Sequence, residues 1–83
     1  MKYTKVDASV MNVIETYHDE HGYMPSYREI GKLMNMTSTA TVARHIDKLF
    51  TLGYIETDLD ESDRARSPRG YRIGAIYGKV QRK

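Results

Sequence analysis

The chain has no cysteine, which excludes disulfide bonds, thiolate metal sites and a cysteine nucleophile. It also lacks an apolar run approaching the ~20 residues that a membrane-spanning helix needs. Neither a glycine-rich phosphate loop nor a plausible Ser-His-Asp grouping is present. With no constellation that could host chemistry, we expect no enzyme, no cofactor and no small-molecule substrate.

The N-terminal nine residues lack the apolar region of a secretory signal, so we expect a cytoplasmic protein with no membrane contact. Eighty-three residues allow one domain with a modest core. A composition of 40% hydrophobic and 29% charged residues is that of an ordinary globular domain rather than a disordered chain.

Acidic residues are absent from residues 64–83, which carry seven basic residues and follow an acidic block in residues 56–63. A basic segment suits a phosphate backbone, because neutralising phosphates releases counterions. A solvated tail is the simpler interpretation of residues 79–83.

The pattern predicts a first helix over residues 4–21. Thr4 and Asp7 have the spacing of a capping box, and Gly22 can supply the left-handed residue that often ends a helix. His18 and His21 lie near the expected C-terminus of this helix, where the helix dipole favours positive charge. No third histidine is placed to complete a recognisable zinc site with them. We therefore expect a scaffold helix without a metal, whose buried face consists of Val6, Val10, Val13, Ile14 and Tyr17.

Residues 26–53 have the pattern of two helices joined by a tight turn. Ser26 and Glu29 form a second capping-box pair, and Asn35 tolerates the left-handed backbone that the turn needs. Gly31 weakens its helix, which indicates close approach of the next one. The buried face of this first short helix is predicted to be Tyr27, Ile30, Leu33 and Met34.

A longer helix is predicted over residues 38–52, with an outer face of small residues and long cations. Small side chains let a helix lie close to the floor of a DNA groove, and Arg44 can form a bidentate contact with guanine. Hydroxyl residues at the N-terminal end can hold a phosphate. His45, at the edge of the buried face, is expected to be partly buried rather than to contact a base. The inward side chains are Val42, Ile46, Leu49 and Phe50.

A strand-like alternation at residues 54–57 and a return strand at 69–73 flank a polar loop that contains Pro68. Arginines on the descending side of this loop are expected to contact the DNA backbone or the minor groove. These elements predict an α+β, mainly helical fold, a winged helix-turn-helix of three helices plus a β-hairpin wing. We expect this domain to span residues 1–74 and a short basic tail to span 75–83, where apolar side chains could serve a partner contact or pack on the first helix.

Residues 21–56, followed by 69–73, resemble the N-terminal DNA-binding domain of LexA-type repressors, and the resemblance covers roughly residues 3–74, most of the chain. The similar elements are residues 22–26, 28–30, 45–49, 53–56 and the RGYRI segment at 69–73. The resemblance implies base reading by Ser38, Ala40, Thr41, Ala43 and Arg44, with Tyr27 and Arg28 beside the phosphate backbone. LexA repressors often place an asparagine and acidic residues on this face, so a different operator is implied. The family's self-cleaving protease domain is not expected here.

We therefore predict a sequence-specific regulator that binds double-stranded DNA, a transcriptional repressor or accessory regulator acting as a homodimer or with a partner regulator. The alternative is a winged helix that docks on another regulator or a polymerase subunit without reading bases, which the seven tyrosines keep open. The predicted DNA contacts are Tyr27, Arg28, Ser38, Thr39, Ala40, Thr41, Ala43, Arg44, Lys48, Arg64, Arg66 and Arg69.

Overall fold

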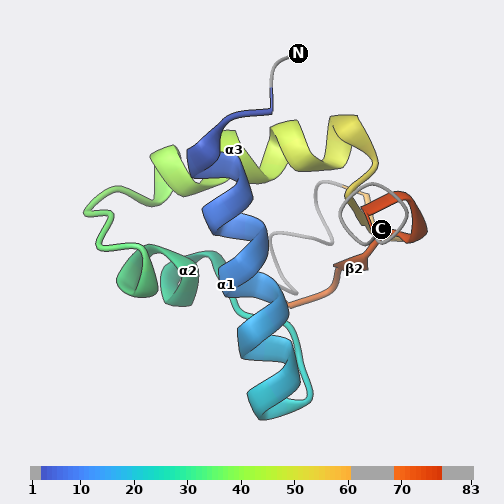
Figure 1. The fold of residues 1–83 in the computed structure, drawn as a ribbon, viewed down its shortest axis with the longest axis horizontal. Coiled ribbons are helices and arrows are strands. Elements are labelled where there is room, and N and C mark those ends of the chain that lie inside the picture. The colour runs from blue at the N-terminus through green and yellow to red at the C-terminus, as the bar shows by residue number, and fades with distance from the viewer. Residues whose placement is uncertain (1–2, 61–68, 78–83) are drawn as a thin grey trace.

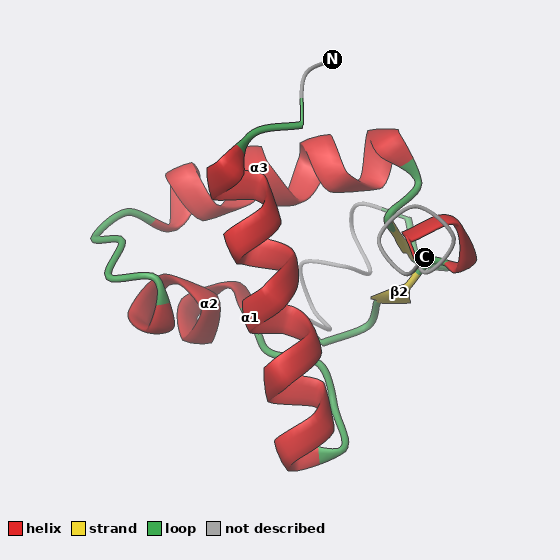
Figure 2. Ribbon diagram, in the orientation of Figure 1, coloured by secondary structure: helices red, strands yellow, loops and turns green. Residues whose placement is uncertain are grey.

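In a computed structural model of the chain, which describes residues 3–60 and 69–77, three helices pack around one core and a short hairpin follows them (Figures 1 and 2). The helices are α1 (Lys5–His21), α2 (Tyr27–Leu33) and α3 (Thr39–Leu52), and the strands are β1 (Ile55–Glu56) and β2 (Arg72–Ile73). Figure 1 shows the turn between α2 and α3 at one side of the molecule and the hairpin at the other. The predicted mainly helical winged helix-turn-helix architecture is confirmed.

Both ends of α1 form as the sequence predicts. The Thr4 hydroxyl accepts a hydrogen bond from the Asp7 amide, and the Asp7 carboxylate accepts one from the Thr4 amide, at 3.2 and 2.8 Å. Gly22 ends the helix with a φ of 79°. The predicted buried face is wrong at Val6, which is 43% exposed. The buried stripe instead runs through residues 7, 10, 11 and 14, so it is rotated towards Met11 and includes the charged Asp7.

The α2–turn–α3 unit is built from local signals. Ser26 and Glu29 form the predicted capping box, and Asn35 has a φ of 57° in the turn. Met36 packs against the core behind that turn. Leu33, which we expected to be buried, is 58% exposed. It is the last residue of a helix of only two turns, in which Ile30 alone of the large apolar residues is fully buried.

The hairpin is shorter than predicted. The strands pair antiparallel, with Ile55 opposite Ile73 and Glu56 opposite Arg72. Beyond this register the Thr57 hydroxyl, rather than the backbone, donates a hydrogen bond of 2.6 Å to the Gly70 carbonyl. The ladder therefore ends after two residues on each strand.

The core extends past residue 74, the predicted end of the domain. Tyr77 is only 7% exposed, and its hydroxyl donates to a Glu15 carboxylate oxygen on α1 at 2.9 Å. Residues 75–77 are helical. Tyr77 thus packs on α1 of its own domain. The other buried hydrophobic residues are Val10, Met11, Ile14, Met24, Ile30, Val42, Ile46, Leu49, Ile55 and Tyr71.

Gly31 should tolerate a methyl group but not a larger side chain. A Cβ built there would lie 3.4 Å from the Met36 carbonyl oxygen and 3.4 Å from Cγ2 of Val42 on α3. We expect Gly31→Leu to lower the free energy of unfolding by about 1–3 kcal/mol through overpacking. Gly31→Ala, the control, should be neutral or stabilising by up to about 1 kcal/mol because alanine favours the helix. Urea unfolding of both variants provides the measurement, and equal effects would contradict the proximity of α3.

Candidate nucleic-acid interface

The N-terminal half of α3 presents an exposed surface of small and hydroxyl side chains. The four residues 38–41 are exposed, and Arg44 is exposed one turn further along, while Ala43 is half-buried. Arg44 makes no hydrogen bond or ion pair with any residue in the described parts of the chain. Its guanidinium is therefore available for an external ligand. On α2, Arg28 is exposed and Tyr27 half-buried.

The start of α3 differs from the starts of the other two helices. The helices α1 and α2 each begin with a complete capping box and an acidic residue in the first turn, Asp7 and Glu29 respectively. In contrast, Ser38 makes no side-chain capping bond, and the first turn of α3 contains no acidic residue. The positive end of the α3 dipole is therefore uncompensated by its own first turn, which favours an external anion there.

A buried carboxylate fixes α3 against α1. Asp7 on α1 is fully buried, and it contacts the His45 Nδ1 at 2.7 Å and the Lys48 Nζ at 2.8 Å. Burial by itself would raise the pKa of Asp7, but hydrogen bonds from Lys48, Thr4 and His45 outweigh burial and hold that pKa well below its usual range. One carboxylate therefore binds two side chains of α3 while also capping its own helix.

The contacts of Asp7 show where two side chains of α3, His45 and Lys48, lie relative to their predicted places. His45 is partly buried, with 20% of its side chain exposed, which confirms its predicted place at the edge of the core. Lys48 does not face outward as predicted, because its ammonium group turns to Asp7 and only 24% of the side chain is exposed. Sequence reasoning identified Asp7 only as a cap. A usable signal was its spacing from Val10 and Ile14, which places it on the buried stripe.

A second carboxylate, Glu29, joins three parts of the chain. It accepts hydrogen bonds from the Ser26 amide at 2.8 Å and the Tyr17 hydroxyl at 2.7 Å, and it forms an ion pair with Arg69. The Arg69 and Tyr17 bonds hold the pKa of Glu29 well below its usual range. The donation to Glu29 raises the pKa of Tyr17 to about 12.

Arg69 lies against the segment between α1 and α2. Its Nη1 also donates to the Met24 carbonyl oxygen at 3.0 Å, and its guanidinium stacks over the Tyr23 ring at 4.8 Å from the centroid. The structure therefore gives Arg69, predicted as a DNA contact, a set of internal partners that the sequence did not reveal. The other two predicted wing arginines, Arg64 and Arg66, lie outside the described residues.

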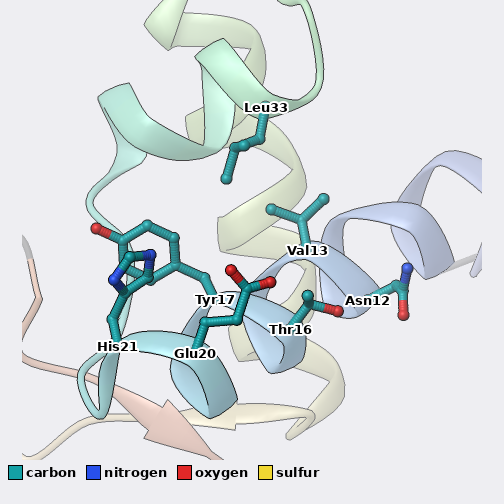
Figure 3. A pocket seen from close by; sticks show the side chains of 7 residues that line it. All are labelled: Asn12, Val13, Thr16, Tyr17, Glu20, His21 and Leu33. Carbon is teal, nitrogen blue, oxygen red and sulfur yellow. The ribbon is translucent and has the colours of Figure 1, made fainter.

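A shallow groove of about 270 Å³ lies elsewhere, on the outer side of α1 and the end of α2 (Figure 3). Val13, Leu33 and the Tyr17 ring supply its apolar lining, and Glu20 contributes a carboxylate. No arginine or lysine lines it, so the groove does not suit a phosphate backbone. None of the described helices has the length and apolar character needed to cross a bilayer.

The sequence of this chain is similar to those of several known proteins. The sequence profile of the LexA DNA binding domain matches residues 1–66. The chain is 42% identical over 55 residues to the LexA repressor of Thermobifida fusca, covering 66% of this chain and 22% of that protein. It is 40% identical over 55 residues to the LexA repressor of Mycobacterium marinum, with the same coverage. The LexA repressor of Bacillus mycoides is 39% identical over 57 residues, or 69% of this chain and 28% of that protein. The chain thus spans about a quarter of the length of these relatives.

Replacing Asp7 should destabilise the fold in a pH-dependent way. We expect Asp7→Asn to lower the free energy of unfolding at pH 7 by roughly 2–3 kcal/mol, because the ammonium of Lys48 loses its counter-charge. Folding lowers the pKa of Asp7, so its ionised form stabilises the fold above the unfolded pKa of about 3.9 and loses this effect as the pH falls below it.

The difference between wild type and Asp7→Asn should therefore narrow between about pH 5 and pH 2, as measured by urea unfolding at several pH values. Asp58→Asn is the control, because the Asp58 side chain is 86% exposed and its loss should cost under about 1 kcal/mol. A difference for Asp7→Asn that stays constant down to pH 2 would show that the carboxylate charge does not stabilise the fold.

The two described arginines near the hairpin should contribute unequally. Arg69→Met removes an ion pair, a bond to a backbone carbonyl and a ring contact, so we expect it to lower the melting temperature. Arg72 bridges the more exposed Glu56 and Asp58, and Arg72→Met should lower the melting temperature less. Thermal unfolding of both variants tests the difference. Equal losses would mean that Arg69 is only a surface ion pair.

Proposed function

The chain belongs to the LexA DNA-binding domain family, and on that premise we propose that it binds double-stranded DNA in a sequence-specific manner and represses transcription. In this proposal α3 enters the major groove, as the second helix of a helix-turn-helix does. The observation that supports it best is the open N-terminal end of α3. This end is exposed and lacks an acidic residue in its first turn, and it is followed by Arg44, which has no ion pair with residues 3–60 or 69–77.

We assign the residues of α3 two kinds of contact. Ser38 and Thr39, together with the first-turn amides, would hold a phosphate and thereby set the depth of the helix. Ala40 and Ala43 would let the backbone approach the bases, while Thr41 and Arg44 would contact base edges. A bidentate arginine–guanine pair is the commonest specific contact in the major groove.

Contacts outside α3 would position the domain. Tyr27 and Arg28 at the start of α2 are proposed to contact the phosphate backbone, and Arg64 and Arg66 are proposed to do so on the basis of sequence. Lys48 and Arg69 are assigned to the scaffold, because each has a carboxylate partner within the fold. A single small module reads few base pairs and binds weakly, so we also propose that two copies occupy a palindromic site. The bound protein would block access of the polymerase.

Selection of bound duplexes from a random DNA pool tests this function directly. We expect enrichment of one palindromic motif, whose half-site spacing gives the separation of two bound copies. Affinity for that motif should fall steeply as salt concentration rises. Recovery of no motif, together with salt-independent binding to another regulator or polymerase subunit, would instead support a protein-interaction module.

Arg44 and Arg28 should differ in the kind of contact they lose. Arg44→Ala is expected to cost about 1–3 kcal/mol on the selected motif and to relax the preference at one base pair. Arg28→Ala should weaken binding to all sequences by a similar factor, because a phosphate contact carries no sequence information. Titration of both variants against the motif and its single-base variants distinguishes the two. A uniform loss for Arg44→Ala would show that α3 is docked differently.

A further inference from the structure

Lys48 occupies a place on α3 from which a cation could reach DNA. It follows Arg44 by four residues, so the two side chains start from neighbouring positions on one side of the helix. A lysine ammonium sits on a flexible four-carbon stem and can turn to different partners. In the structure the Lys48 Nζ turns inward, to the Asp7 Oδ2 at 2.8 Å.

The Asp7 carboxylate that binds Lys48 is itself held in place by several contacts. Its carboxylate is fully buried, and the Thr4 amide and hydroxyl bind the same oxygen that Lys48 binds, at 2.8 and 2.9 Å. The other oxygen contacts His45 at 2.7 Å. Withdrawing the ammonium would remove a counter-charge from a buried carboxylate, which is strongly unfavourable. This cost favours retention of Lys48 by Asp7 over its transfer to a phosphate.

We propose that Asp7 is a positioning residue that docks α3 through His45 and withholds Lys48 from the DNA backbone, leaving Arg44 as the long cation that α3 presents to DNA. This inference rests on the proposed DNA-binding function. Its consequence is a bias towards specificity. Each additional phosphate contact strengthens binding to every sequence alike, whereas a cation held inside the domain adds none of this indiscriminate affinity.

The salt dependence of DNA binding tests the proposal, because a Lys48 that contacts the DNA backbone would contribute to the slope of log K against log salt, whereas a Lys48 held by Asp7 would not. The slope is negative, and each phosphate contact adds about 0.9 to its magnitude. We expect Lys48→Gln to leave this magnitude unchanged, whereas Arg28→Gln, the matched loss of a proposed phosphate contact, should lower it by about 0.9. The glutamine amide can still donate to Asp7. Circular dichroism establishes that each variant is folded at the assay temperature.

Asp7→Asn tests the release of Lys48. We expect the magnitude of the slope to rise by about 0.9. The ratio of the non-specific binding constant at 50 mM salt to that at 200 mM salt should then be about threefold to fourfold larger than in the wild type. The double variant Asp7→Asn with Lys48→Gln should return to the wild-type slope. If Asp7→Asn is too unstable to assay, the Lys48→Gln slope still decides whether Lys48 contacts the DNA backbone in the wild type.

Two results would overturn the proposal. One is a slope magnitude lowered by about 0.9 in Lys48→Gln, and the other is a magnitude that rises in Asp7→Asn and stays raised in the double variant. Failure of the proposed function is a separate outcome. If the wild type enriches no motif but binds non-specific duplex, sequence reading is wrong, while the Lys48→Gln and Asp7→Asn slopes still test whether Asp7 withholds the cation. If Arg28→Gln also leaves the slope unchanged, the proposed placement of α2 on the backbone is wrong, and the Asp7→Asn and double-variant slopes decide whether Asp7 withholds the cation.

Discussion

The buried carboxylate of Asp7 determines how the exposed helix of this domain is held. A charge without solvent contact persists only if it is paired and hydrogen-bonded, and Asp7 meets that condition through Thr4 on its own helix and two side chains of α3. Apolar packing of Val10, Ile46 and their neighbours brings the two helices together, but such packing is non-directional. The ionic contacts add a defined direction, so α3 is fixed both along its axis and in rotation.

The three helices divide the work of the domain by how their ends are satisfied. The first turns of α1 and α2 meet their own donors with capping boxes, and both caps use carboxylates that continue into tertiary contacts. The first turn of α3 has neither an acid nor a side-chain cap. The element proposed to contact DNA is thus the one whose positive end is left for a ligand, on a scaffold whose other helix starts are closed.

Sequence reasoning succeeded where the deciding partners lie within a few residues. The caps at Thr4 and Ser26, the left-handed turn at Asn35 and the end of α1 at Gly22 all follow from local backbone chemistry. It failed where a polar side chain finds a distant partner. From the sequence, Lys48 and Arg69 were predicted to contact DNA, yet the carboxylates that they bind lie 41 and 40 residues away in the chain. Likewise, the Tyr77 hydroxyl donates a hydrogen bond to a residue 62 positions earlier. Nothing in the local pattern distinguishes a cation that faces solvent from one that faces such an acid.

The contacts of Glu29 link the unfolding of the helices to the unfolding of the hairpin. Its carboxylate joins the last turns of α1 through Tyr17, the start of α2 through Ser26, and the chain just before β2 through Arg69. Partial opening of the hairpin therefore weakens the ends of two helices at once, and loosening of α2 releases the hairpin. In a domain with only two residues in each strand, this shared contact makes it unfavourable for the helix-turn-helix and the hairpin to open separately. Amide protons at the Ser26 cap and in the hairpin should accordingly exchange with solvent through one common opening event rather than two independent ones.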